Sequence, residues 1–260
     1  MFAYTPAPSP NQGYNQISTM KVAVILPAAG LGTRMGRHAA EKTGTSRKQF
    51  MLLEGSPILL HTIRKFVAST LVEEIVVALR ADDLGWVGDL LAKEALAKPV
   101  RLVQGGESRQ ESVENALAVI GPDVDLVAVH DAVRPFIDLA TIDKVIHEAA
   151  QTGAAIVGIV PVDTVKTLHK NKVRGTVPRE GLALAQTPQV FRYALLKQAF
   201  EKAREDGFIA TDESSLLERL DQAEVSVVLG SDRNLKITKP SDMDLARLFL
   251  AEEMAERRVS

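Results

Sequence analysis

The stretch KVAVILPAAGLGTRMG (residues 21–36) joins an apolar run to a glycine-rich turn near the start of the chain. The apolar part is almost continuous, which is typical of a strand buried on both faces of a parallel sheet. Gly30, Gly32 and Gly36 follow, together with Arg34 and no acidic residue. Because ligands of open α/β sheets bind beyond the carboxyl ends of the strands, this order predicts a buried strand that ends in a ligand-binding turn.

Downstream of this turn, apolar patterns with the period of a helix alternate with short apolar runs, which are typical of strands. The expected strands are 21–28, 73–80, 100–106, 124–132 and 154–162. The expected helices between them are 57–69, 82–96, 108–120 and 139–153. Regular alternation of this kind predicts an α/β fold with a doubly wound, mostly parallel sheet, Rossmann-like in its layering.

The alternation breaks at residues 163–187, which alternate only weakly and contain the turn formers Asn171, Gly175 and Gly181. This segment predicts a β-hairpin arm that projects from the sheet, at about residues 162–187. The elements expected after it are helices at about 193–204 and 213–222, a strand at 225–230, a segment at 234–238 and a last helix at about 241–256. No internal repeat or linker divides the chain, so we predict one domain that contains the arm.

Composition restricts the class of protein. The chain has 260 residues, of which 46% are hydrophobic, enough for one large α/β domain. A net charge of −2 argues against nucleic acid as a partner, because nucleic-acid-binding domains are usually basic. No apolar run is long enough for a transmembrane helix, so we expect no membrane association. The absence of cysteine excludes disulfides and thiolate catalysis and agrees with the cytoplasmic localisation that we predict.

The start of the chain differs from the rest. Residues 1–19 are rich in Pro, Asn, Gln and Ser, and they lack the basic start and apolar core of a signal peptide. This composition is typical of disorder. We therefore expect a dispensable tail, followed from Met20 by a folded domain over residues 20–258.

The spacing of the glycines separates three kinds of nucleotide loop. A dinucleotide-binding fingerprint needs its third glycine one residue earlier, and a Walker A loop needs a Gly-Lys-Ser/Thr that is missing here. A phosphate loop remains, in which backbone N–H groups approach an anion closely and Arg34 and Lys48 add positive charge. A tight strand-to-helix turn without a ligand is the alternative.

The motif HDAVRP (residues 130–135) ends a predicted strand and supplies a candidate metal ligand. Mg²⁺ is often held by substrate phosphates and one or two carboxylates, and Asp131 is the best candidate carboxylate. The alternative is that Asp131 caps a helix or pairs with Arg134. No two of the five histidines have metal-ligand spacing, and we expect His130 to be structural.

Seven motifs then occur in order over residues 21–244. They are PAAGLGTRMG followed by KQF, QGGESRQESVENAL, HDAVRPF, PVDTVK, TPQVF, ATDESSLLE and NLKITKPSDM. Together they resemble the 2-C-methyl-D-erythritol 4-phosphate cytidylyltransferase family, within the sugar nucleotidyltransferase-like proteins. The resemblance implies an enzyme that joins CTP and 2-C-methyl-D-erythritol 4-phosphate to give CDP-methylerythritol and pyrophosphate. It places this reaction in non-mevalonate isoprenoid biosynthesis and implies Mg²⁺ as cofactor.

The resemblance also assigns residues to the nucleotide. Arg34 and Lys48 are implied to stabilise charge on the triphosphate, and Asp131 to lie beside the ribose and Mg²⁺. The residues implied to contact CTP directly are Ala28, Ala29, Gly30 and Gly32 around the triphosphate, Gly106 at the cytosine and Ser112 at the base or ribose.

A second group of residues is implied to hold the polyol phosphate. Thr164 and Arg179, both in the arm, would hold its phosphate group together with Lys236. Thr211 and Asp212 would border the pocket. In this family the arm reaches the neighbouring subunit, which implies a homodimer with shared sites.

Two departures from the family pattern stand out. Residues 36–47 form a longer connection than usual, and Arg47 stands where the family often has proline. Lys42 therefore competes with Lys48 for the catalytic role, although the KQF that begins with Lys48 fits the family. Glu107 follows the glycine pair where an acid is common, and it is a further candidate for a cytosine contact.

Three other functions compete with this interpretation. A ribitol-5-phosphate cytidylyltransferase shares most of the motifs, because both substrates are polyol phosphates. A nicotinamide-dependent dehydrogenase is disfavoured by the glycine spacing. A nucleotide-sensing domain would bind CTP without turnover, and the presence of Arg34, Lys48, Arg179 and Lys236 together argues against it.

Overall fold

A computed structural model describes residues 20–30 and 47–259 of the chain. The predicted tail at residues 1–19 lies outside the described residues, and so do Gly32, Arg34 and Lys42.

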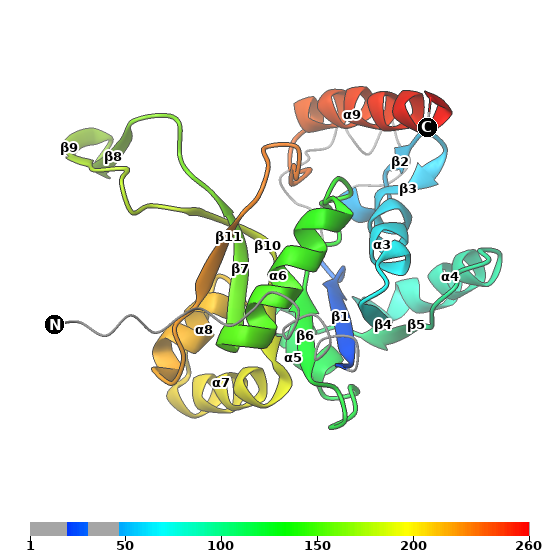
Figure 1. Cartoon of the computed structure of the whole chain (residues 1–260), viewed down its shortest axis with the longest axis horizontal. Coiled ribbons are helices and arrows are strands. Elements are labelled where there is room, and N and C mark those ends of the chain that lie inside the picture. Colours follow the sequence, from blue (N-terminus) through cyan, green and yellow to red (C-terminus); the bar gives the residue numbers. More distant parts are fainter. Residues whose placement is uncertain (1–19, 31–46, 260) are drawn as a thin grey trace, which may run out of the picture.

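A seven-stranded sheet forms the centre of the domain, with the order β11-β7-β10-β6-β1-β4-β5 (Figure 1). Its strands are β1 (Val22–Pro27), β4 (Val72–Leu79), β5 (Val100–Gln104), β6 (Leu126–Val129), β7 (Ala154–Ile159), β10 (Leu184–Arg192) and β11 (Ser226–Leu229). β10 is antiparallel to both of its neighbours, and the other pairings within this sheet are parallel. The predicted mostly parallel α/β sheet is confirmed.

Helices cover both faces of the sheet. They are α3 (Ile58–Ala68), α4 (Ala81–Ala92), α5 (Arg109–Leu117), α6 (Leu139–Thr152), α7 (Tyr193–Asp206), α8 (Glu213–Leu220) and α9 (Pro240–Val259). Alternate β1 side chains enter two separate cores: Val24 packs with α3, α4 and α6, and Ile25 packs with α5, α7 and α8. The sheet is therefore doubly wound, as the alternation of apolar runs predicts.

The arm is shorter than predicted, and the segment after it belongs to the sheet. The hairpin consists of β8 (Val165–His169) and β9 (Lys172–Val177), which pair only with each other among the described strands. Figure 1 shows this arm extending away from the body of the domain. Residues 184–187, placed in the arm by the sequence, begin β10 between β6 and β7. The polar sequence AQTPQ conceals this strand, because Gln186, Thr187 and Gln189 are buried with their side chains hydrogen-bonded to residues distant in the sequence.

A third, smaller core joins α9 to the carboxyl edge of the sheet. It includes Met51 beside the short hairpin of β2 (Leu52–Leu53) and β3 (Ser56–Pro57), together with Val133, Ile237 and Met243. The backbone N–H of Ile237 donates to the carbonyl of Val133 at 3.0 Å. This bond fixes the predicted segment 234–238 beside the end of β6. No helix in the described ranges is both long and apolar enough to cross a membrane.

The connections of β1 create a crevice at the carboxyl ends of the strands. The chain runs from β1 to β4 and β5 on one side and then returns to β6 on the other side of β1. Such a reversal separates the loops that follow adjacent strands, and ligands of α/β sheets bind there. The glycine-rich stretch starts at the end of β1, at this reversal.

Candidate active site

A pocket of about 250 Å³ opens at the carboxyl ends of β1, β5 and β6. It lies where the strand order reverses. The predicted site residues that line it are Ala28, Ala29, Gly30, Lys48, Gly106, Ser112, Asp131 and Lys236. Glu107 and Arg109 line it as well. The fold thus brings together residues from four motifs that are far apart in the sequence.

The turn after β1 is held by a buried glutamine. Ala28 continues the strand by donating its N–H to the carbonyl of Ala78 at 2.8 Å. Nε2 of Gln49 donates to the carbonyls of Ala28 at 2.7 Å and Gly30 at 3.0 Å. Gln49 belongs to the 3-10 turn η2 (Lys48–Phe50), so these bonds tie the segment that carries Lys48 to the first residues of the glycine-rich loop.

The glycine pair before α5 allows two loops to approach each other. A Cβ atom on Gly105 would lie 2.7 Å from the Cβ of Ala29, and one on Gly106 would overlap the side chain of Glu111. The N–H of Gly106 donates to Oγ of Ser112 at 3.1 Å, and that hydroxyl donates to the carbonyl of Ser108 at 2.8 Å. Ser112 therefore shapes the turn on which Gly106 and Glu107 face the pocket.

The start of α5 is fixed by its own sequence. Ser108 accepts a hydrogen bond from the N–H of Glu111, and the Glu111 carboxylate accepts from the N–H of Ser108, which together form a capping box. Glu111 also accepts from the N–H of Glu107 at 2.7 Å. The first residue of this helix, Arg109, is thereby directed from a rigid helix end into the site.

Three cations surround Asp131 at the end of β6. Its Oδ1 accepts from Nε of Arg109 at 3.3 Å, and its Oδ2 contacts Nε of Arg134 at 3.3 Å and Nζ of Lys236 at 2.8 Å. Burial alone would raise the pKa of Asp131, but the three cations outweigh it and hold the pKa well below its usual range. The carboxylate stays ionised, and the pairing with Arg134 that the sequence left open is present.

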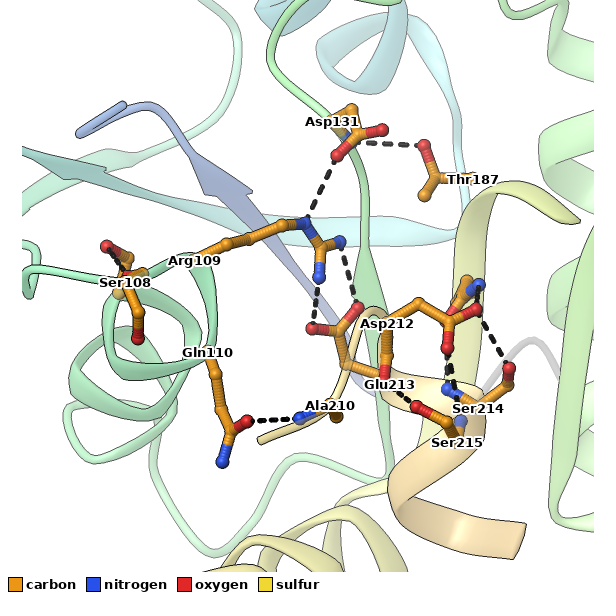
Figure 2. A network of polar contacts seen from close by, with 12 residues as sticks. Ser108, Arg109, Gln110, Asp131, Thr187, Ala210, Asp212, Glu213, Ser214 and Ser215 are labelled. Atoms are coloured by element: carbon orange, nitrogen blue, oxygen red, sulfur yellow. Dashed lines mark hydrogen bonds and ion pairs between the residues drawn. The ribbon is translucent and has the colours of Figure 1, made fainter. Parts of the chain in front are cut away.

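Arg109 connects this carboxylate to a second, fully buried one (Figure 2). Its Nη1 and Nη2 donate to Oε1 and Oε2 of Glu213 at 2.7 and 2.9 Å. Burial disfavours the charge on Arg109, but Glu213 and Asp131 raise its pKa above the ordinary value. Burial raises the pKa of Glu213, and the guanidinium opposes that shift. The bidentate geometry of this pair is the arrangement that stabilises buried charges best.

Asp212 caps α8 rather than lining the pocket. It accepts hydrogen bonds from the N–H of Ser215 at 3.2 Å, Nε2 of Gln189 at 2.8 Å and the hydroxyl of Ser214 at 2.9 Å (Figure 2). Burial would raise its pKa, but these donors lower it. Thr211, beside it, is exposed. Asp212 therefore fixes the helix end that presents Glu213 to Arg109.

The arm residues lie apart from this pocket. Thr164 and Arg179 are both exposed, and neither lines the pocket of its own chain. Nη1 of Arg179 donates to the carbonyl of Val162 at 2.8 Å, at the base of the arm. Within one chain, the structure does not bring these two predicted residues together with Lys48 and Asp131.

Arg109, Glu213 and Gln49 contribute to the site although no role was predicted for them, and all three lie inside the seven motifs. The serine and glutamate of the capping box are a sequence signal for the start of a helix, and this signal would have placed Arg109 in the first turn. The sequence held no comparable signal for Glu213, because its partner is 104 residues away.

His130 is a buried, neutral member of the same network. Its ring is completely buried, and burial lowers its pKa to about 4. The carbonyl of Arg134 lies 3.0 Å from Nε2, so this nitrogen carries the proton. Nδ1 accepts from the hydroxyl of Thr187 at 3.1 Å, and that hydroxyl accepts from the N–H of Asp131 at 3.0 Å. The ring therefore orients the backbone of Asp131, as its predicted structural role requires.

The buried neutral ring predicts a pH dependence of stability. Between about pH 6.5 and about pH 4 the unfolded histidine binds a proton that the folded one excludes, so falling pH favours unfolding. We expect His130 to contribute about 2 kcal/mol to the loss of unfolding free energy between about pH 7 and about pH 5. Urea denaturation of the wild type and His130→Gln at both pH values measures this. Equal losses in the two proteins would contradict it.

The residues of the pocket fit a metal ion that takes most of its ligands from the substrate. The described residues contain no group of three or more His, Asp or Glu side chains that could hold a metal ion. Mg²⁺ is commonly bound by one or two carboxylates and the phosphates of its substrate. Asp131 is ionised and lines the pocket, so it can supply one carboxylate oxygen if a cation now beside it moves aside.

Comparison with known proteins identifies the family. The family described as 2-C-methyl-D-erythritol 4-phosphate cytidylyltransferase (IspD) matches residues 22–252. The protein of that name from Solibacter usitatus is 66% identical over 93% of this chain and 100% of its own length. The one from Acidobacterium capsulatum is 47% identical over 90% and 98% of the two chains.

Solved structures agree with the sequence comparison. The crystal structure of the 4-diphosphocytidyl-2C-methyl-D-erythritol synthase from Anaerococcus prevotii superposes with a TM-score of 0.76 at 29% identity, covering 89% of this chain and 99% of that one. The cytidylyltransferase from Francisella tularensis gives a TM-score of 0.73 at 32% identity over 88% and 99% of the two chains. This chain, in both sequence and fold, belongs to the 2-C-methyl-D-erythritol 4-phosphate cytidylyltransferase family.

Proposed function

We propose that this protein transfers the cytidylyl group of CTP to 2-C-methyl-D-erythritol 4-phosphate, forming CDP-methylerythritol and pyrophosphate. The observation that carries the proposal is the pocket at the end of β1, which Lys48, Arg109 and Lys236 line together with the first residues of the glycine-rich turn. Cations beside a loop of N–H groups suit a triphosphate, whose charge is redistributed during reaction. Relatives with this family's name at high identity support the choice of substrate.

The reaction needs no general base. A phosphate oxygen of methylerythritol phosphate, already an anion, forms a bond to the α-phosphorus of CTP. The bond from that phosphorus to the bridging oxygen breaks, and its electron pair leaves with pyrophosphate. The neutral, buried state of His130 agrees with a mechanism in which no side chain accepts a proton. Catalysis then consists of holding two anions in line and stabilising the charge that develops.

Each pocket residue has a place in this scheme. Ala28, Ala29 and Gly30 would offer backbone space to the triphosphate, and Gly106 would contact the cytosine. Lys48 would stabilise the leaving pyrophosphate, with Arg34 as the second cation from the glycine-rich loop.

Lys236, which also lines the pocket, is implied to bind the incoming phosphate. Its ammonium pairs with Asp131 at 2.8 Å, within reach of the pocket. The guanidinium of Arg109 keeps Asp131 ionised when Lys236 turns toward substrate, because it contacts the same carboxylate.

Mg²⁺ is the cofactor that we propose for Asp131. When bound, it would neutralise phosphate charge and so ease the approach of the two anions. The protein's part is to keep Asp131 deprotonated, which Arg109, Lys236 and Arg134 do by lowering its pKa.

Thr164 and Arg179 lead us to propose a homodimer. These two residues are proposed to contact the substrate phosphate, but neither lines the pocket of its own chain. They would therefore have to reach the pocket of another copy. The arm also exposes apolar side chains, among them Val162, which is 80% exposed, Leu168 and Val173. We propose that a second copy covers these apolar side chains. Thr164 and Arg179 of the first copy would then contact the polyol phosphate in the pocket of the second copy, near its Thr211.

Pyrophosphate release with CTP and Mg²⁺ tests the proposed function. We expect release with 2-C-methyl-D-erythritol 4-phosphate and none above background with ribitol 5-phosphate, each supplied alone. Release with ribitol 5-phosphate alone would overturn the substrate assignment while leaving cytidylyl transfer intact. CTP binding without release from either substrate would favour a nucleotide-sensing domain instead.

A further inference from the structure

An ion pair connects the turn that carries Lys48 to the rest of the domain, and neither of its residues takes part in the proposed reaction. Arg47 directly precedes η2, and its Nη1 donates to Oδ1 of Asp83. Asp83 lies in the first turn of α4, and its side chain is completely buried. A carboxylate this deep needs a contacting cation, because removal from water strongly disfavours an isolated charge. Arg47 supplies that cation.

Two aromatic rings complete the cluster. Nε1 of Trp86 donates to the same Oδ1 of Asp83 at 3.3 Å. The rings of Trp86 and Phe50 meet edge to face, with centroids 4.6 Å apart and planes at 76°. The guanidinium of Arg47 lies over the Phe50 ring, 5.6 Å from its centroid. We call Arg47, Phe50, Asp83 and Trp86 the Arg47 cluster.

This cluster and the Gln49 contacts hold the two sides of Lys48. On one side Arg47 is anchored to α4, and on the other Gln49 donates to the carbonyls of Ala28 and Gly30. The N–H of Phe50 donates to the carbonyl of Arg47 at 3.0 Å, and this hydrogen bond closes the turn around Lys48 and Gln49. The backbone of Lys48 is thereby fixed relative to both the glycine-rich turn and α4, at a position where Lys48 lines the pocket.

We propose that the Arg47 cluster positions Lys48 for the reaction, so that Arg47 and Asp83 are positioning residues that act through the Lys48 ammonium. The inference rests on the proposed role of Lys48. The buried ion pair with Asp83 and the contact with the Phe50 ring restrain the residue directly before Lys48.

The test is a double-mutant cycle on kcat for pyrophosphate release. Arg47→Met removes the charge and is expected to lower kcat about 10- to 100-fold, because a small displacement of a catalytic group is that costly. In a Lys48→Ala background, Arg47→Met is expected to have no further effect on kcat. Arg47→Lys retains a cation opposite Asp83 and is expected to recover most of the rate. A purely structural role would not produce this dependence on Lys48.

The outcomes separate the two proposals. If Lys48→Ala itself leaves kcat unchanged, the proposed role of Lys48 fails, and the positioning proposal fails with it. If Lys48→Ala is slow but Arg47→Met lowers kcat equally in both backgrounds, only the positioning proposal is overturned. An unchanged kcat for Arg47→Met in the wild-type background would overturn it as well.

Two further variants exclude a loss of folding as the cause. Arg47→Met leaves Asp83 buried without its cation, so the double variant Arg47→Met/Asp83→Asn removes that charge as well. We expect this double variant to melt at a higher temperature than Arg47→Met alone and to remain slow. Arg64→Met is the matched control, because it breaks an ion pair with Glu94 outside the active-site pocket. It is expected to keep the wild-type kcat, and a similar loss of rate there would contradict a specific effect.

Discussion

Replacing Lys48 with alanine is expected to slow pyrophosphate release about 100- to 1000-fold, with a smaller change in the KM for CTP. Lys48 lines the pocket beside the glycine-rich turn, where we propose that the leaving pyrophosphate gathers charge as its bond to the α-phosphorus breaks. An interaction that strengthens as this charge develops contributes mainly to kcat. Steady-state kinetics with saturating 2-C-methyl-D-erythritol 4-phosphate and varied CTP separates the two constants.

The matched control for this variant is Lys21→Ala. Lys21 precedes the other end of β1, pairs with Asp123 and lies outside the pocket, so its loss is expected to leave kcat unchanged. A near-normal rate for Lys48→Ala would contradict the assignment and transfer the role to Lys42, which the variant Lys42→Ala would then test. Urea denaturation of each variant shows whether a lost rate reflects a lost fold.

The sequence predicted most of the sheet because its central parallel strands β1, β4, β6 and β7 are largely buried on both faces. A strand such as β1, with Val24 in one core and Ile25 in the other, must be apolar throughout, and such a run is visible without any knowledge of its partners. β10 has the same central place but contains Gln186 and Gln189, both buried. Their hydrogen bonds to Ser231 and to Asp212 make burial possible, and the sequence does not reveal partners that distant.

The residues of the candidate site also differ in how far they can be predicted from the sequence. Ala28 and Gly30 are predicted from the sequence alone because the constraint on them is local: a turn at a strand end must leave space for a close approach. The role of Gly106 follows only from the family resemblance. The ion pairs were harder to predict because they depend on distant partners. The family resemblance implies separate roles for Asp131 and Lys236, and the structure shows them paired at 2.8 Å.

Replacing Glu213 with glutamine is expected to lower the free energy of unfolding by about 3 kcal/mol, because it leaves the Arg109 guanidinium without its bidentate partner. Glu213 is 1% exposed, so water cannot take the place of the lost carboxylate. The rate is expected to fall as well, since Arg109 also contacts Asp131 inside the pocket. Urea denaturation and pyrophosphate release measure the two effects. Glu218→Gln, on the exposed face of α8, is the control and is expected to change neither.

A double variant separates the stability effect from the rate effect. Arg109→Met/Glu213→Met removes both charges and fills the space with apolar atoms, and such replacements of buried ion pairs are often neutral or stabilising. We therefore expect it to recover most of the unfolding free energy lost in Glu213→Gln. We expect the rate to stay low, because Asp131 loses one of the cations that lower its pKa. Recovery of both stability and rate would mean that the Arg109 pair only supports the fold, and that Lys236 and Arg134 suffice to hold Asp131 in its reactive state.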